Sequence, residues 1–436
     1  MNSTDILLLN LPLATWYKKV FAQTNSMPPL GLLYVATMLK NNSYSIKVID
    51  MAVEELNIED FTKLLSKYNP KMVGMSTYNE SWNSQKILCR IIKRVLPDAK
   101  IFAGGAFATF NYEDILNESL TDYVIRGEGD YSSLELCDVV FGRSQKNLND
   151  IGGLAWKDET GKIIVNQARA RIANLDDLPI PDRELVDLSK YTLGYTISTA
   201  RGCPGDCIFC SSRAFWGKRV CLRSAESIFG EIMHLHDKFG AKTFYIADDT
   251  FTASRKRAIS VCNMLKESNI NFLWGCESRS DVVDEDLIKT LAEAGCFKIQ
   301  FGMESGDNEV LRRLKKKVTV EQIENAVSLA CKYNMHITVS FIVGHAFDTH
   351  ETVKKTLDFA RHLQSKYGAS TVGSINTPFP GTEQYEEAEK YGIKIHSHDW
   401  NNYRLNNAII STKYLDINQI RSYYQEVLAL QINNRD

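Results

Sequence analysis

The sequence predicts a two-part α/β protein, in which a doubly wound parallel sheet precedes a partial (β/α)6 barrel and a helical C-terminal tail. Short apolar runs alternate with helix-like segments twice along the chain. Most of the runs are apolar throughout, as expected for strands buried on both faces of a parallel sheet. The expected boundaries are 1–145 for the first domain, 146–190 for a linker with a hairpin, 191–384 for the barrel and 385–436 for the tail.

The first domain is expected to contain five strands separated by helices. Strands are predicted at 5–11, 45–50, 72–77, 99–105 and 122–127, and helices at 29–40, 59–67 and 84–95. Ligands of such sheets bind beyond the carboxyl ends of the strands. The segments 10–13, 76–79, 104–109 and 126–129 therefore form the candidate binding edge.

The linker and the second domain follow. A hairpin is expected around 159–161, and the proline- and acid-rich stretch 175–188 is typical of a linker. Strands are then predicted at 195–200, 242–247, 271–277, 297–302, 336–344 and 370–376. Helices at 224–239, 255–268 and 320–333 separate some of them. Six such units close only part of an eight-stranded TIM-type barrel, so the tail is expected to cover the open side or the site.

Composition excludes several classes of function. The formal net charge of −2 gives no global attraction to nucleic acid or to anionic lipid, and we expect neither as a partner. No segment is long and apolar enough to span a bilayer, and Asp5 stands where a signal peptide would be positive. The sequence therefore predicts a cytoplasmic protein. The basic run 312–317 is interpreted as a solvated face.

Three of the ten cysteines are clustered. Cys203, Cys207 and Cys210 follow the first strand of the second series with the spacing C-x3-C-x2-C. Three thiolates can hold one face of a [4Fe–4S] cluster and leave one iron without a protein ligand, which is typical of a catalytic metal site. A structural zinc site is the weaker alternative, because its usual spacing is different. Most of the seven scattered cysteines are expected to be small buried apolar residues.

This cysteine motif, with an aromatic residue before its last cysteine, resembles the radical S-adenosylmethionine (SAM) superfamily. The resemblance implies that the open iron binds SAM, which is cleaved to a 5′-deoxyadenosyl radical. Phe209 then corresponds to the residue that packs near the adenine. Further motifs at later strand ends are similar to those of the family, and the SAM contacts they imply are Asp248, Asp249, Glu277, Arg279, Glu304 and Ser305.

Some of these assignments have alternatives. Arg279 is suited to bidentate binding of the methionine carboxylate. Asp248, Asp249 and Glu304 have helix capping or surface ion pairing as alternative roles. The chain departs from the family after its fifth strand, where Gly-His-Ala-Phe at 344–347 replaces a common Gly-Leu-Pro-Gly turn. There His345 is either a substrate contact or acid–base group, or a hydrogen-bonded loop residue.

The first domain resembles the cobalamin-binding subfamily over the stretches 28–39, 73–79, 101–109 and 122–130. The resemblance implies that cobalamin is bound, with its nucleotide tail near Ser76, Thr77, Gly104, Gly105 and Glu128. The D-x-H-x-x-G signature is absent, since residues 10–30 contain no histidine, which implies no lower histidine ligand to cobalt. The alternative is a domain that has kept the fold and binds no corrin.

The resemblance implies methyl transfer to an unactivated carbon of a small-molecule or natural-product substrate, using methylcobalamin and the deoxyadenosyl radical. The alternative is a cyclase, ring-contraction or other carbon-skeleton enzyme without methyl transfer. A methylthiotransferase or a non-catalytic binding protein is less favoured. A reducing partner such as flavodoxin or ferredoxin is implied. In the tail, His396, His398, Trp400 and Tyr403 either contact the substrate or only pack the open edge.

Overall fold

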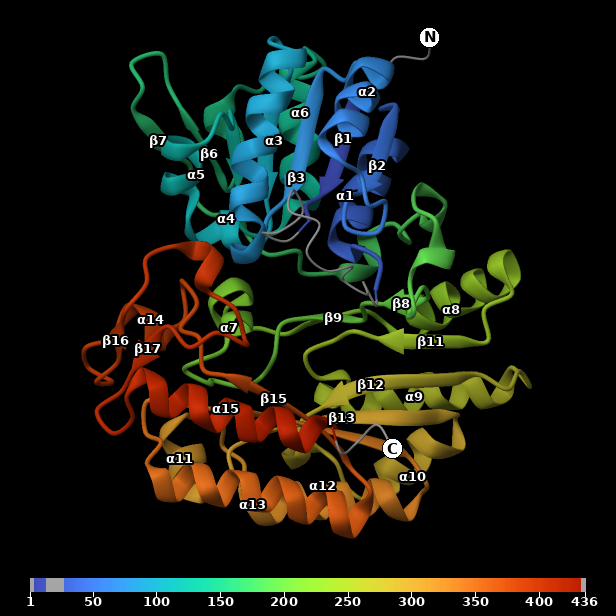
Figure 1. The fold of residues 1–436 in the computed structure, drawn as a ribbon. Helices are drawn as coiled ribbons and strands as arrows, with labels where there is room; N and C mark the ends of the chain where they lie inside the picture. The colour runs from blue at the N-terminus through green and yellow to red at the C-terminus, as the bar shows by residue number, and fades with distance from the viewer. Residues whose placement is uncertain (1–3, 13–26, 433–436) are drawn as a thin grey trace. The chain divides into compact units, whose positions relative to one another are not determined.

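The computed structural model describes residues 4–12 and 27–432. The chain divides into two compact units, Met1–Gly194 and Tyr195–Asp436, and each is described by itself (Figure 1).

A seven-stranded sheet forms the centre of the first unit, with the order β2-β1-β3-β4-β5-β6-β7. The five parallel strands are β1 (Ile6–Asn10), β2 (Ile46–Asp50), β3 (Met72–Ser76), β4 (Lys100–Gly104) and β5 (Tyr123–Ile125). Side chains alternate along β1, so that Ile6 and Leu8 enter one apolar core and Leu7 and Leu9 enter the other. The predicted strands and the doubly wound class are confirmed.

Helices cover both faces of this sheet. On the side of Ile6 and Leu8, the core includes residues of α1 (Leu30–Asn41) and α6 (Gly129–Val140), and on the opposite side residues of α2 (Ile58–Tyr68) and α3 (Trp82–Val95). The bounds of α2 follow from its sequence. The side chain of Asn57 accepts a hydrogen bond from the backbone N–H of Asp60, and Asn69 ends the helix in a left-handed conformation. Two short helices, α4 (Ala106–Phe110) and α5 (Tyr112–Glu118), connect β4 to β5.

The segment 146–190 differs from the predicted linker. Its hairpin is present as β6 (Leu154–Lys157) and β7 (Ile163–Val165), and it continues the first sheet because β6 pairs antiparallel with β5. The rest of the segment also lies in the first unit: Lys40 pairs with Asp182 at 2.6 Å, and Lys190 pairs with Glu54 at 2.8 Å. The pairing of β6 with β5 and these polar contacts attach the segment to the first unit, although its proline and acidic content is typical of a linker.

The second unit contains a six-stranded parallel sheet with the order β15-β14-β13-β12-β11-β8. The strands are β8 (Thr196–Ile197), β11 (Thr243–Ile246), β12 (Leu273–Ser278), β13 (Cys296–Glu304), β14 (His336–Val343) and β15 (Ser370–Ile375). The connecting helices include α8 (Ala225–Phe239), α9 (Arg255–Glu267), α10 (Glu285–Glu293), α12 (Val320–Lys332) and α13 (His350–Tyr367). The predicted partial barrel of six units is confirmed.

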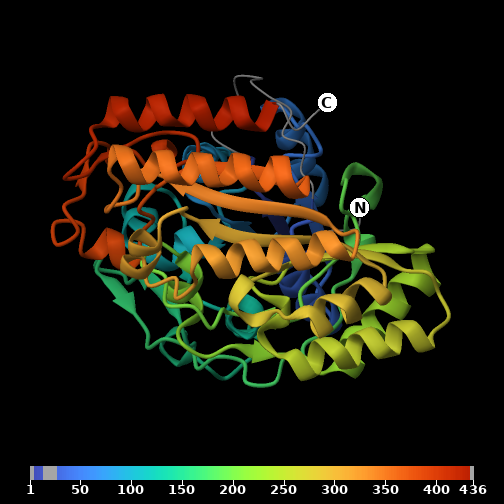
Figure 2. The ribbon, with the colours of Figure 1, turned by 90° about the horizontal axis from the view of Figure 1, so that it is seen from below.

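The tail is helical only in part. After α14 (Glu383–Glu386), a small antiparallel sheet pairs β16 (Lys394–Ile395) with β17 (Ile410–Ser411), and α15 (Ile417–Ile432) follows. Figure 2 shows α15 in red alongside α13 in orange. Gly373 of β15 allows α15 to approach the strand closely, because a Cβ atom at position 373 would lie 2.3 Å from a methyl carbon of Val427. This helix therefore covers the sheet at its β15 edge.

Among the described residues, no helix combines the length and the apolar character needed to cross a membrane.

Candidate functional site

The three clustered cysteines lie on a loop of residues 202–210, called the cluster loop here. It connects β9 (Ala200–Arg201) to α7 (Ser211–Trp216). The loop is fixed at its centre, because the N–H of Ile208 donates to Leu314 at 3.2 Å and its carbonyl accepts from Gln384 at 3.0 Å. A Cβ atom at position 205 would lie 3.5 Å from Sγ of Cys203 and 3.7 Å from Sγ of Cys207. The two sulfur atoms thus face the same small space.

The thiols of this loop fit an iron–sulfur cluster. All three are free, with Cys207 buried and the other two half-buried. Burial raises the pKa of the Cys210 thiol to about 12 and also raises the pKa of Cys207, against the positive charges of Lys316 and Arg279. Within the described parts of the chain, no three acidic, histidine or cysteine side chains converge on a single ion. Three thiols on one loop are suited to bind three corners of a [4Fe–4S] cluster.

Asp248, a predicted SAM contact, is instead bound to the protein. Its carboxylate accepts hydrogen bonds from the N–H groups of Thr199 at 2.6 Å and Ala200 at 3.0 Å, and from the Thr199 hydroxyl. Arg257 lies 3.6 Å from the same carboxylate. All its partners lie within the protein, so Asp248 positions the strand that leads into the cluster loop.

Asp249 and Glu277 retain carboxylate oxygens for a ligand. Asp249 is exposed at the end of β11 and accepts from the Ser212 hydroxyl at 2.5 Å. The Tyr245 hydroxyl donates to Glu277 at 3.4 Å. Burial raises the pKa of Glu277, and the negative charge of Asp249 adds to this rise. The two carboxylates therefore lie close enough to interact, and both follow strands that end at the same edge of the sheet.

Arg279 does not have the free face that bidentate binding of a substrate carboxylate requires. Its Nε and Nη2 donate to the two oxygens of Asp281 at 2.9 and 2.8 Å, and Nη2 also donates to the carbonyl of Lys316 at 2.7 Å. The edge that would form two bonds to the methionine carboxylate is thus occupied by Asp281, and such binding by Arg279 stays a prediction. Only Nη1 is directed elsewhere, and it lies 3.0 Å from the Cβ position of residue 205.

Glu304 ends β13 with a left-handed backbone conformation, φ = 60°. Its carboxylate accepts from Nζ of Lys316 at 2.8 Å, and both side chains are about nine-tenths buried. Gly302 leaves space for this pair, because a Cβ atom there would lie 2.5 Å from Glu304 Oε1 and 2.7 Å from Lys316 Nζ. Sequence reasoning missed Lys316, because it lies within the basic run that was interpreted as solvated.

The side chain of Ser305 is enclosed by other residues of the protein. Its fully buried hydroxyl lies 3.2 Å from the hydroxyl of Thr356 on α13 and accepts from the N–H of Asp307 at 3.2 Å. It thus fixes the turn after β13 and does not reach toward the cluster loop with a free donor.

His345 is completely buried after β14, and its ring centre lies 5.4 Å from that of Phe209 in the cluster loop. The backbone of Glu304 faces the imidazole, yet among the described residues neither ring nitrogen makes a well-formed hydrogen bond. The alternative roles of His345, a substrate contact or acid–base group or a hydrogen-bonded loop residue, therefore stay predictions. Burial lowers its pKa to about 3, so the ring is neutral.

The turn that carries His345 is held by Asp348. That carboxylate accepts from the N–H groups of Gly344 at 3.0 Å and His345 at 2.9 Å, and burial raises its pKa to about 7. Two further polar side chains nearby were not predicted. Gln384 donates to Asn376 at 3.0 Å, while Oε1 of the first and Nδ2 of the second lack partners in the described structure. Nothing in their sequence context distinguishes these amides from loop residues.

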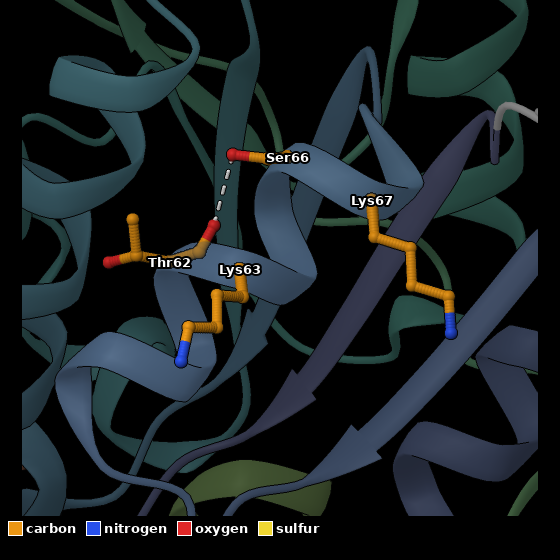
Figure 3. Close-up of a pocket in the computed structure, with 4 residues that line it drawn as sticks. All are labelled: Thr62, Lys63, Ser66 and Lys67. Atoms are coloured by element: carbon orange, nitrogen blue, oxygen red, sulfur yellow. Dashed lines mark hydrogen bonds between the residues drawn. The ribbon is translucent and has the colours of Figure 1, made fainter.

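A cavity of about 640 Å³ opens beside the cluster loop. Its walls are formed by residues of the loop, of α7 and the residues that follow it, of the segment before α12, and of the start of α14. They are Pro204, Asp206, Cys207, Cys210, Arg213, Ala214, Lys218, Lys315, Gly381, Thr382 and Glu383. Two of the three clustered cysteines, Cys207 and Cys210, therefore line this cavity. By contrast, a depression on α2 of the first unit has no convergent groups. There Lys63 and Lys67 project apart, and the Ser66 hydroxyl donates to the carbonyl of Thr62 (Figure 3).

In the first unit, four predicted cobalamin contacts lie together at the carboxyl ends of β3 and β4. The N–H of Thr77 donates to Gly104 at 2.9 Å, and a Cβ atom at Gly105 would lie 3.1 Å from the Thr77 carbonyl and 3.6 Å from the Ser76 hydroxyl. Gly105 has φ = 97°, which favours glycine. The buried Thr77 hydroxyl has no partner among the described residues. Ser76, Thr77, Gly104 and Gly105 thus form a small polar site, called the cradle here. Its backbone groups and the unpaired Thr77 hydroxyl fit the polar nucleotide tail of cobalamin.

Glu128, the fifth predicted cobalamin contact, is engaged elsewhere. It is buried at the start of α6 and accepts from the N–H of Ile172 at 2.8 Å, with Arg171 at 3.9 Å. These contacts attach the segment that follows the hairpin, and a contact between Glu128 and cobalamin stays a prediction. Residues 13–26, which belong to the stretch 10–30 where the D-x-H-x-x-G signature is absent, lie outside the described residues.

The candidate tail residues mostly pack or point outward. Trp400 and Tyr403 have ring centres 4.8 Å apart, and Tyr403 is buried. His396 and His398 are exposed, and the first lies 2.8 Å from the Ser411 hydroxyl. These contacts favour packing at the sheet edge for the two aromatic residues.

Comparisons with known proteins match both units. Residues 197–360 match the model of the radical SAM superfamily, and residues 22–136 match that of the B12 binding domain. The chain is 32% identical over 425 residues to a protein of Pyrococcus horikoshii described as an uncharacterized methyltransferase, covering 96% of this chain and 90% of that protein.

Two other proteins are informative. The anaerobic magnesium-protoporphyrin IX monomethyl ester cyclase of Rubrivivax gelatinosus is 28% identical over 400 residues, which cover 89% of this chain and 71% of the cyclase. The radical SAM methyltransferase TsrM from Kitasatospora setae, solved with cobalamin and a [4Fe–4S] cluster, shares the fold with a TM-score of 0.75 at 19% identity. That match covers all of this chain and 89% of TsrM.

Proposed function

Because the chain belongs to the cobalamin-binding radical SAM enzyme family, we propose that it transfers a methyl group to an unactivated carbon of a small-molecule or natural-product substrate. The family membership implies three cofactors: a [4Fe–4S] cluster, SAM and cobalamin. When bound, they supply reductive cleavage of SAM and a carrier for the methyl group.

Specific residues of the chain would hold these groups. Cys203, Cys207 and Cys210 would bind the cluster, and the cradle of Ser76, Thr77, Gly104 and Gly105 would receive the tail of cobalamin. Glu304, Asp249 and Glu277 would accept hydrogen bonds from the ammonium or ribose groups of SAM, since carboxylates accept only. Phe209 would pack against the adenine. The buried His345 and the half-buried Phe209 would exclude water from the reacting centre.

The observation that supports this proposal most directly is the convergence of the Cys203 and Cys207 sulfur atoms on Gly205, on a loop whose N–H and C=O groups at Ile208 are tied to two other elements. Free thiols fixed in one place are suited to bind a preformed inorganic cluster. The unpaired Thr77 hydroxyl supports the cobalamin part independently.

A second candidate function is cyclisation, ring contraction or another carbon-skeleton change without methyl transfer. The similarity to the Rubrivivax gelatinosus cyclase favours it as the alternative. Under either function we propose a one-electron reducing partner such as flavodoxin or ferredoxin, a cytoplasmic location, and no nucleic acid or membrane partner.

The test uses the full chain, reconstituted without oxygen with iron, sulfide and hydroxocobalamin, then mixed with reductant and SAM carrying a labelled methyl group. Candidate substrates are supplied as extracts of the source cells. We expect 5′-deoxyadenosine and a product that gains the label. A product of unchanged methyl content would favour the cyclase-type function. If no deoxyadenosine forms although the Cys331→Ala control and the native chain both carry iron and sulfide, the radical SAM assignment of activity is wrong.

A further inference from the structure

The guanidinium of Arg279 presents two different edges. The edge with Nε and Nη2 is fully used by the carboxylate of Asp281, and Nη2 also contacts the Lys316 carbonyl. The remaining nitrogen, Nη1, makes no hydrogen bond to any residue within the described ranges. The side chain is 7% exposed, so the guanidinium as a whole lies largely within the protein.

The free edge of Arg279 faces the cluster loop. Nη1 lies 3.0 Å from the Cβ position of residue 205, and the sulfur atoms of Cys203 and Cys207 lie 3.5 and 3.7 Å from that same point. The nitrogen and both sulfur atoms therefore surround one glycine. Any larger residue at position 205 would push the guanidinium away from the sulfur atoms. The N–H of Gly205 itself donates to Cys203 Sγ at 3.4 Å, so N–H donors reach this sulfur from the backbone as well.

We propose that Arg279, oriented by Asp281, is a tuning residue that makes the iron–sulfur cluster easier to reduce. This inference rests on the proposed function, because it requires a cluster on these cysteines. Reduction takes one electron from an external one-electron donor and adds one negative charge to the cluster. A fixed cation beside two of its thiolates stabilises the reduced form more than the oxidised form. An arginine is suited to this task because it stays charged at every physiological pH.

Substitution of Asp281 tests the direction in which the reduction of the cluster shifts. The carboxylate of Asp281 fixes the direction of the guanidinium and at the same time offsets part of its positive charge at 2.8 Å. An asparagine at this position keeps an oxygen that can accept one of the hydrogen bonds but removes the negative charge. The charge of Arg279 then acts on the cluster with less compensation. Arg279→Gln and Asp281→Asn should therefore shift the cluster in opposite directions, whereas general damage to packing would not.

The experiment measures the midpoint potential of the cluster in the full chain after anaerobic reconstitution, in the absence of SAM. Dithionite and mediators set the potential, and electron paramagnetic resonance records the reduced cluster. For Arg279→Gln we expect at least a tenfold lower ratio of reduced to oxidised cluster at a given potential, which equals about 59 mV for a one-electron couple. Asp281→Asn should raise that ratio several-fold, and Arg279→Lys should fall between Arg279→Gln and the native chain.

The matched control is Arg255→Gln. Arg255 also pairs with an aspartate, Asp284, through contacts of 2.6 Å, but it does so on the surface. We expect its potential to equal that of the native chain. The inference is overturned if Arg279→Gln assembles a cluster with the native potential, or if both buried variants shift in the same direction. If Arg279→Gln does not fold, Asp281→Asn alone decides by the sign of its shift. A native chain without any cluster signal would instead overturn the proposed function.

Discussion

Glu304 and Lys316 form an ion pair at 2.8 Å in which neither side chain is more than 11% exposed. A buried pair of this kind contributes little net stability compared with apolar residues, yet removal of one partner leaves an isolated charge away from water. The pair lies where β13 ends, and Gly302 provides the space that it occupies. Its two members therefore depend on each other strongly.

Lys316→Met should destabilise the second unit, because it leaves the Glu304 carboxylate buried without its cation. We expect a loss of about 3–5 kcal/mol in the free energy of unfolding. Chemical denaturation of the cofactor-free chain, followed by tryptophan fluorescence and circular dichroism, measures the change. Lys317→Met is the control, since Lys317 is exposed and its pair with Asp206 is a surface contact. Equal losses in the two variants would contradict the role given to Lys316.

Gly105→Ala should weaken cobalamin uptake by the first unit. The added methyl group would meet the Thr77 carbonyl at 3.1 Å, and alanine disfavours φ = 97°. Titration with hydroxocobalamin, followed by its visible spectrum, should show at least a tenfold loss of affinity. Gly142→Ala is the control for backbone strain, because Gly142 has φ = 68° with no atom near its Cβ position. Native affinity in Gly105→Ala would show that the tail binds elsewhere.

His345 predicts a dependence of stability on pH. Burial lowers the pKa of His345 in the folded chain to about 3. Between about pH 6.5 and pH 3, the imidazole therefore binds a proton in the unfolded chain but not in the folded chain. The stability that the neutral ring contributes is present above that window and is lost as the pH falls through it. His345→Leu should remove this loss. Urea denaturation of both chains at several pH values between 4 and 7 measures the difference.

Asp348 should change the free energy of unfolding with pH in the direction opposite to that of His345. Burial raises the folded pKa of Asp348 to about 7, so the folded chain keeps a proton that the unfolded chain releases as the pH rises from about 4. The native chain should therefore lose stability relative to Asp348→Asn between about pH 4 and pH 7. The same urea series tests this variant. Parallel curves for Asp348→Asn and the native chain would mean that Asp348 does not titrate in this range.

Asp248→Asn should reduce assembly of the cluster without touching a cysteine. The substitution removes the carboxylate oxygen that accepts from the Thr199 hydroxyl and the negative charge that faces Arg257, and Thr199 lies just before the cluster loop. We expect less iron and sulfide per chain after reconstitution, measured by metal and sulfide analysis. Asp249→Asn is the matched control, because Asp249 is exposed and its carboxylate accepts a single hydrogen bond from the described residues, that of the Ser212 hydroxyl. It should assemble a full cluster.

The strands and the cysteine loop could be predicted from the sequence because their signals are local. An apolar run such as that of β1, or three cysteines within eight residues, carries its meaning in a short window. The contacts of Asp248 and Arg279 could not be predicted. Asp248 bonds Thr199 and Arg279 bonds Lys316, and the two residues of each pair are more than 30 positions apart in the sequence. The hairpin at 154–165 was recognised, but its pairing with β5 is a long-range contact that the linker-like stretch beside it concealed.

The two backbone bonds at Ile208 have a consequence for how the protein matures. A loop that is tied to Leu314 and Gln384 loses conformational freedom when the second unit folds. The incoming cluster does not have to order the chain around itself, so the empty and loaded forms should have nearly the same backbone there. Maturation should then be limited by delivery of iron and sulfide and not by rearrangement of the polypeptide.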